Sequence, residues 1–266
     1  MFNFVLYCRE MKGLWKMLAI FVSVMTMYIA IVVSMYDPKL KDSINQLVAM
    51  MPGLMDAMGF NAENTGLIGY FSSYLYGFIL VVFPMVFSIL CGNKLIARYV
   101  DKGSMVSLLS APVKRRTVAF TQMKVITTGI VALVVFATII IIALSEICFP
   151  GELDIPKFLL INIGLLCLHL FIGGICFIFS CIFSDAKYSI GLGAGIPSLM
   201  FILQMLGNVG GSAETAKYFT FFTLFNPDGL SIGESSSIAG TLVLFAGAIM
   251  LFFVAITVFS KKDLHI

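Results

Sequence analysis

Six long apolar stretches take up most of the chain, and charged residues fall mainly in the connections between them. The stretches run over residues 14–35, 70–91, 125–148, 157–183, 189–206 and 238–260. The hydrocarbon core of a bilayer requires about 20 mainly apolar residues per helix, so each stretch is long enough to cross it. Backbone groups inside the bilayer must bond within their own segment, which favours helices. The pattern predicts an all-α, polytopic membrane protein with a single transmembrane domain over residues 1–266.

A buried helical core in a soluble protein is the alternative to membrane spans. Helices of that kind carry a polar face at the helical period, and most of these stretches have none. The hydrophobic fraction of 60% and the mean hydropathy of +1.03 agree with membrane spans.

The basic residues predict which way the spans are oriented. Six spans place both termini on one side of the membrane. Only four of the 17 Lys and Arg residues fall in the connections on the other side, namely Lys39, Lys41, Lys157 and Lys217. The positive-inside rule therefore predicts that both termini are cytoplasmic. The net charge of +3 is then a sign of topology and implies no nucleic-acid partner.

The first 13 residues form an amphipathic segment ahead of the first span. Its apolar and charged side chains separate at helical spacing, with Phe2, Val5, Leu6 and Tyr7 opposite Arg9, Glu10 and Lys12. Such a helix can lie along the headgroups as an elbow before the chain enters the bilayer. The alternative is a frayed start to the span itself. Residues 34–36 contain no small-x-small cleavage site, so we expect an uncleaved signal anchor.

The second connection contains a short helix candidate, over about residues 104–112. Ser104 can cap it after the flexible Gly103, and Pro112 ends it. Its apolar side consists of Met105, Val106, Leu108 and Leu109. One reading is a helix that docks into a groove of another protein. The other is a helix that rests on its own spans or on lipid, with the neighbouring basic residues bound to anionic headgroups.

This connection resembles that of the membrane subunits of ABC-2 type exporters. The resemblance rests on an acidic residue, a Gly-Ser pair, a Leu-Leu-Ser-x-Pro stretch and basic residues before the third span, here Asp101, Gly103, Ser104, Leu108, Leu109, Ser110, Pro112, Arg115, Arg116 and Lys124. The family more often has Glu where this chain has Asp101. The six-span plan, the cytoplasmic termini and the elbow extend the resemblance over nearly the whole chain.

The resemblance implies a coupling helix at about residues 104–112 that seats in a separate ATP-binding subunit. Met105, Val106, Leu108 and Leu109 would dock there, with Arg115 and Arg116 as supporting contacts. It further implies two ATPase subunits that hold the ATP and Mg, and a second permease copy, identical or related. The location would be a bacterial plasma membrane, and the substrates amphipathic peptides or lipophilic compounds.

Three groups inside or near the bilayer are candidates for the transport pathway. His169 is the only ionisable residue near the middle of a span, so it either faces a pathway or bonds a neighbouring helix as a neutral ring. Gln204 is a milder candidate. Phe221, Phe222 and Phe225 belong to a run before the last span that is either re-entrant, forming an outer gate as in the resembled family, or an aromatic belt at the interface.

The motifs missing from the sequence argue against an enzyme. No Gly-Lys dipeptide occurs, which excludes the phosphate loop G-x-x-x-x-G-K-[ST], and H-E-x-x-H is also missing. The six cysteines contain no C-x-x-C pair, so neither a disulfide framework nor a zinc site is expected. An ion-coupled secondary transporter is the alternative function. It would need inverted repeats and ion ligands at mid-membrane, where His169 is the only candidate.

Overall fold

The computed structural model describes residues 2–37, 50, 66–101, 113–208 and 211–262, and within these ranges it is helical without strands. Six helical runs are long and apolar enough to cross a membrane, which confirms the predicted all-α, six-helix architecture. They are α1 (Phe4–Met35), the run Leu67–Asp101, α8 (Arg115–Cys148), α9 (Ile155–Ile182), α10 (Ala186–Asn208) and α12 (Ser235–Lys261).

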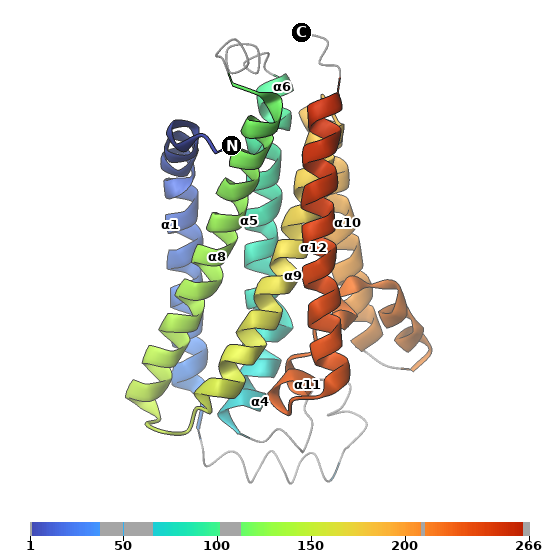
Figure 1. Cartoon of the computed structure of the whole chain (residues 1–266). Coiled ribbons are helices and arrows are strands. Elements are labelled where there is room, and N and C mark those ends of the chain that lie inside the picture. Colours follow the sequence, from blue (N-terminus) through green and yellow to red (C-terminus); the bar gives the residue numbers. More distant parts are fainter. Residues whose placement is uncertain (1, 38–49, 51–65, 102–112, 209–210, 263–266) are drawn as a thin grey trace.

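The helices extend beyond the predicted spans at several ends. Helix α1 is continuous from Phe4 and has no break at residue 13, although Figure 1 shows its first, dark blue turns nearly end-on, across the direction of the rest. Helix α8 begins at Arg115 rather than near residue 125. Arg115 and Arg116 therefore belong to a helical first turn and not to the connection in which the sequence placed them.

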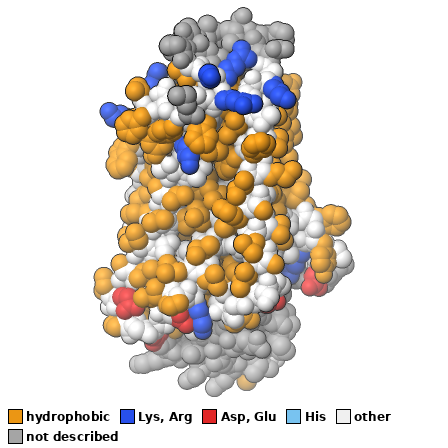
Figure 2. All heavy atoms as spheres, in the orientation of Figure 1, with side chains coloured by type: hydrophobic (Ala, Val, Ile, Leu, Met, Phe, Trp, Pro, Cys, Tyr) orange, Lys and Arg blue, Asp and Glu red, His pale blue; other side chains and the backbone are white. Residues whose placement is uncertain are grey.

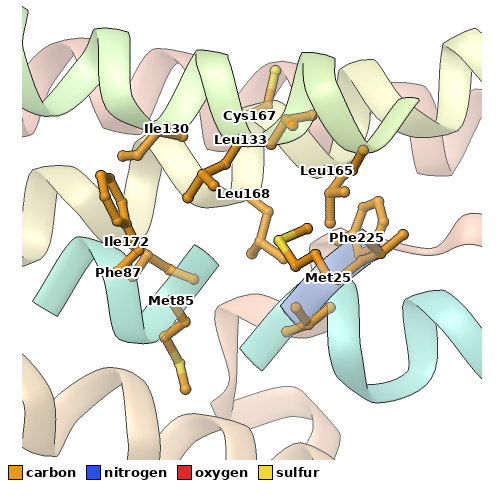
Figure 3. Packing of buried hydrophobic residues seen from close by; sticks show 14 of the residues in the cluster. Met25, Met85, Phe87, Ile130, Leu133, Leu165, Cys167, Leu168, Ile172 and Phe225 are labelled. Atoms are coloured by element: carbon orange, nitrogen blue, oxygen red, sulfur yellow. The ribbon is translucent and has the colours of Figure 1, made fainter. Parts of the chain in front are cut away.

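Helix α9 lies at the centre of the bundle and packs against α5, α8, α10 and α12, while α1 packs mainly on α8 (Figure 1). Side chains from α5, α8 and α9 converge in the core, among them Phe87, Ile130, Leu133, Leu168 and Ile172 (Figure 3). Helices α9 and α12 approach each other closely at Gly174, where an added Cβ would lie only 3.0 Å from Leu251 Cβ.

The second run changes helix type along its length. It consists of α4 (Leu67–Phe71), the π-helical segment η2 (Ser72–Ile79), α5 (Leu80–Leu95) and α6 (Ala97–Asp101). Helix α5 contains Pro84, which has no N–H to give to the carbonyl four residues earlier. A π segment followed by a proline makes this the least regular of the six runs, and such segments occur frequently at functional sites.

The two ends of the bundle differ in charge (Figure 2). The start of α1, the end of α12 and helix α6 lie at one end, where Lys and Arg side chains gather, and we call it the basic end. The Asp and Glu side chains visible in Figure 2 lie toward the opposite end, together with a few lysines. At that opposite end Tyr36 packs on Tyr70 and Phe149, and burial, with the nearby Glu152 carboxylate, raises the pKa of Tyr36 to about 12.

The chain between α10 and α12 folds into three short helices, η3 (Gly211–Phe219), η4 (Phe221–Leu224) and α11 (Pro227–Ser231). Asn226 caps α11 by accepting from the Gly229 N–H. Helix α12 comes so close that a Cβ added at Gly240 would lie 2.5 Å from the Leu224 carbonyl oxygen. These short helices are therefore packed onto the bundle.

Candidate functional site

The first turns of α1 are bonded to α8 at the basic end. Asn3 caps α1 by accepting from the Leu6 N–H, and the Asn3 N–H donates to Thr121 Oγ1 of α8 at 3.1 Å. The Tyr7 hydroxyl is 3.1 Å from Thr128 Oγ1 of the same helix. These contacts fix the predicted elbow segment against α8.

The same segment is also bonded to the second run. Glu10 is only 4% exposed, and the Tyr99 hydroxyl of α6 donates to its Oε1 atom at 2.6 Å. A buried carboxylate is costly without such a partner, and a hydrogen bond to an ionised acceptor is about twice as strong as a neutral one. Nearby, Lys94 Nζ donates to the Gly13 carbonyl at 2.8 Å. Helix α1 is thus held to α5 and α6 next to the point where α6 ends.

Helix α6 is held on its other side by α9. The Ala97 N–H at the start of α6 donates to Ser180 Oγ at 2.9 Å, and both residues are buried. Asp101 is the last residue of α6 and is exposed. The chain therefore leaves α6 at a point that is fastened to both α1 and α9.

Helix α8 begins at Arg115, which is bonded to the residue that caps α12. Arg115 Nη1 donates to the Lys262 carbonyl at 2.8 Å, and Lys262 Nζ donates to the Cys181 carbonyl of α9 at 3.3 Å. Burial lowers the pKa of the Lys262 ammonium. Arg116 is exposed beside this cluster.

The predicted docking residues Gly103, Ser104, Met105, Val106, Leu108, Leu109 and Pro112 lie outside the described residues. Helix α6, which ends at Asp101, and helix α8, which begins with Arg115 and Arg116, both have these ends at the basic end (Figure 1).

His169 is fully buried and bonds to another helix. Its Nε2 atom is 2.8 Å from the carbonyl oxygen of Leu80, so this nitrogen carries the donated proton. Leu80 lies four residues before Pro84, and its carbonyl therefore lacks the usual helical donor. His169 supplies the missing hydrogen bond.

Cys176 supplies a similar bond two turns further along α9. Its Sγ atom donates to the Gly193 carbonyl of α10 at 3.3 Å. Gly193 lies four residues before Pro197, so its carbonyl has also lost its helical donor. Helix α9 thus satisfies the carbonyls that both intramembrane prolines leave open, through side chains seven residues apart on one face.

The outer-gate candidates pack into the bundle at the end opposite the basic end. Phe221 and Phe222 stack with ring centroids 4.5 Å apart; Phe221 contacts Phe171 of α9, and Phe222 contacts Phe201 of α10. Phe225 is buried against Tyr76 of η2, with ring centroids 6.2 Å apart.

Gln204 belongs to the same end. Its Oε1 atom accepts a hydrogen bond from Thr223 Oγ1 at 2.9 Å and another from Thr220 Oγ1. Gln204 therefore joins α10 to η4, which carries Phe221 and Phe222 and is followed directly by Phe225.

Gly229-Leu230-Ser231-Ile232-Gly233 fits the hydrolase pattern G-x-S-x-G, but its surroundings do not fit that chemistry. The hydrolase motif places its serine on an exposed strand-to-helix turn. Ser231 instead ends helix α11, is 5% exposed, and donates to the Asp228 carbonyl at 2.6 Å. The pattern has a structural role here.

Sequence reasoning missed the Glu10–Tyr99 pair and the role of Cys176. The burial of Glu10 could not be predicted, because a Glu at this position of an amphipathic segment would be expected to face solvent. The prolines within the spans could have been used for prediction. Each one removes the helical hydrogen bond to the carbonyl four residues earlier, so a donor from another span must bond to that carbonyl, and few spans contain a suitable donor.

No protein-family model matches the chain, and no curated protein matches it.

Proposed function

We propose that this chain is the membrane subunit of an ATP-driven exporter of the ABC-2 type. The observation that carries the proposal is that the two helix ends on either side of residues 102–112 in the sequence are fastened: α6 is bonded to α1 and α9, and Arg115 of α8 is bonded to Lys262. A connection between two fastened helix ends suits a contact that must transmit force, and the apolar residues in its sequence suit docking into a groove. The sequence pattern around it, from Asp101 to Arg116, points to an ABC ATPase as the partner.

In this proposal a pair of ATPase subunits closes on ATP and displaces the coupling helix. Met105, Val106, Leu108 and Leu109 make the apolar contact, and the exposed Arg116 adds a charged one. The displacement passes through Glu10–Tyr99 to α1, through Ala97–Ser180 to α9, and through Arg115 to α12. ATP and Mg belong to the partner, and this chain converts their motion into a tilt of its spans.

The basic end faces the cytoplasm of a bacterial cell in this proposal. Its support is the gathering of Lys and Arg there, which the positive-inside rule associates with the cytoplasmic side. The ATPase subunits then lie on the side where ATP is available.

The transport pathway lies between two copies of the permease. Helix α9 fills the centre of a single bundle, so the larger space for a substrate arises on the twofold axis of a dimer. The copies are either identical or closely related. Amphipathic peptides or lipophilic compounds are the proposed substrates, because the frequent Met and Phe side chains provide adaptable apolar surfaces.

Co-purification with the ATPase tests this proposal. Replacing Leu108→Asp and Leu109→Asp together should abolish recovery of the ATPase with the tagged permease, because two charges cannot enter an apolar groove. The pair Leu108→Met and Leu109→Met is the matched control, since it keeps the apolar face and should retain the partner. Membrane insertion of both variants is checked by their resistance to carbonate extraction.

A doubly charged variant that still binds and stimulates the ATPase would contradict the docking assignment. Loss of the partner from the Met variant as well as the Asp variant would point to a general folding defect, and the assignment would fail as well.

A further inference from the structure

The π-helical segment η2 lies next to the outer-gate candidates. The Leu80 N–H that follows η2 bonds to the Leu75 carbonyl, five residues earlier in the chain. A π turn therefore closes one residue later than an α turn, which pairs residues four apart. Conversion of η2 to an α-helix would release about one residue from the segment and change its register relative to α5.

The end of η2 toward α5 is fixed to another helix. The Leu80 carbonyl is bonded by His169 Nε2 of α9 at 2.8 Å. On its other side η2 follows the five-residue helix α4, where the Tyr70 hydroxyl donates to the Val32 carbonyl of α1 at 3.3 Å. A change of register in η2 would therefore turn η2 and α4 relative to α5, which stays bonded to α9.

Polar groups on the buried face of η2 lack partners in the π-helical form. Ser72 and Tyr76 are buried, and neither hydroxyl has a hydrogen-bond partner among the described residues. The Tyr76 hydroxyl and the Asn162 side chain of α9 are neighbours, but their geometry does not make a hydrogen bond. These groups are also out of reach of water. A buried polar group without a partner lowers stability, so a rotation that took both hydroxyls off this face would relieve a cost.

Two aromatic side chains of η2 contact the outer-gate candidates. Tyr76 packs on Phe225, which belongs to the core shown in Figure 3, with ring centroids 6.2 Å apart. Phe78 packs on Phe201 of α10 at 6.0 Å, and Phe201 contacts Phe222 at 5.6 Å. A step of one residue in an α-helix corresponds to a rotation of about 100°. Such a rotation of η2 would break both ring contacts that it makes.

We propose that η2 is a register switch for the outer gate. In the π-helical form, Tyr76 holds Phe225 and Phe78 holds Phe222 through Phe201. Conversion to an α-helix turns Tyr76 and Phe78 away, so that η4 and α11 are able to move off the bundle. The gating role rests on the exporter proposal, whereas the register change is a property of this chain alone and is measured without the ATPase.

Hydrogen–deuterium exchange of the purified full-length protein in detergent tests the switch. Deletion of Gly77, an exposed residue of η2, removes one residue from the segment and should make it α-helical. The amides of residues 221–231 should then exchange about tenfold faster, as expected from the loss of two aromatic contacts. Exchange in α8 should not change. Gly77→Ala is the matched control, because it keeps the number of residues and should exchange as the wild type does.

Tyr76→Phe tests the same switch without a deletion, should the deletion variant fail to fold. It keeps the ring that packs on Phe225 and removes a hydroxyl that has no partner in the π-helical form. The closed form should therefore be favoured, with about fivefold slower exchange of residues 221–231. Tyr188→Phe removes a hydroxyl from an exposed position of α10 and should leave this exchange unchanged.

Wild-type exchange of residues 221–231 in the deletion variant would overturn the proposal, because the outer gate would not depend on the register of η2. Equal acceleration in α8 would overturn it as well, since the effect would then be a general loosening of the bundle. So would faster exchange in Tyr76→Phe, which would show that the hydroxyl is already bonded in the closed form. Absence of ATP-driven transport, with all these exchange results as expected, would contradict the exporter proposal and leave the switch in place.

Discussion

His169 of α9 supplies the hydrogen bond that Pro84 removes from α5. Pro84 removes an N–H from α5, and His169 of α9 bonds the Leu80 carbonyl that is left open. An unsatisfied buried carbonyl costs about 1–3 kcal/mol, and more where no water reaches it. The position of His169 is therefore accounted for by helix packing. Transport does not have to be invoked for it.

A double-mutant cycle tests this pairing. His169→Leu should lower the free energy of unfolding by about 1–3 kcal/mol, because it removes the donor to Leu80. Pro84→Ala restores an N–H at position 84, so His169→Leu should cost much less in that background. Unfolding in mixed micelles measures all four proteins. Equal costs in both backgrounds would show that His169 does not serve the proline-opened carbonyl.

At the scale of elements, the close approaches of helices depend on particular glycines. A Cβ added at Gly92 would lie 2.9 Å from Cys176 Cβ and 3.3 Å from the Cys176 carbonyl carbon, so α5 and α9 would have to move apart. Gly191 of α10 has nothing within 4 Å of an added Cβ. The G-x-x-x-G spacing of Gly191 and Gly195 is thus not used for packing among the described residues, whereas Gly92, with no such motif, is.

Alanine at these two positions should act in opposite ways. Gly92→Ala should destabilise the protein by about 1–3 kcal/mol through overpacking. Gly191→Ala, in the same residue class but at an open position, should be neutral or slightly stabilising because alanine favours the helix. Thermal unfolding in detergent compares them. A Gly191→Ala variant that is the less stable of the two would contradict the described packing.

The hydrogen bond between α1 and α6 is accepted by the buried carboxylate of Glu10. Removing only the donor should therefore cost more stability than removing both partners. Tyr99→Phe should destabilise the protein by about 1–3 kcal/mol, because Glu10 then lacks its 2.6 Å donor. Adding Glu10→Leu should recover much of that loss, since no unpaired charge remains. The free energies of unfolding of the two single variants and the double variant test this pairing. If the losses of stability simply add in the double variant, Tyr99 and Glu10 do not interact directly.

The elements were predictable from sequence to different degrees. Six continuous apolar runs predict six helices because the bilayer allows little else. The π-helical segment at Ser72–Ile79 was not predicted, since Ser72, Ser73 and Gly77 are also compatible with a regular helix. The extension of α8 back to Arg115 was missed because charged residues end an apolar pattern without ending a helix.

At the scale of the whole molecule, the basic side chains are unevenly distributed. Most of the described Lys and Arg residues gather at the end where α1 begins and α12 ends (Figure 2). That both termini are cytoplasmic stays a prediction. The candidate site was predictable only in part. The sequence pointed to residues 101–116, but the bonds that fasten their flanks join positions such as Tyr99 and Glu10, or Arg115 and Lys262, which no local pattern connects.

Two natural cysteines report the orientation without engineered labels. Cys148 is exposed at the end opposite the termini, and Cys8 is partly exposed at the basic end, whereas the other four are buried. In intact cells a membrane-impermeant maleimide should label Cys148, and Cys148→Ser should remove that label. Cys8 should react only in inverted vesicles. The reverse pattern would place the basic end outside the cell.

Transport into proteoliposomes tests the central claim most directly. The chain is reconstituted with and without the ATPase that co-purifies with it, and movement of a fluorescent amphipathic peptide is followed. We predict accumulation only when the ATPase is present and ATP is hydrolysed, with none from a non-hydrolysable analogue. Uphill accumulation by the chain alone on an ion gradient would contradict the account, because this chain would then be a self-sufficient transporter.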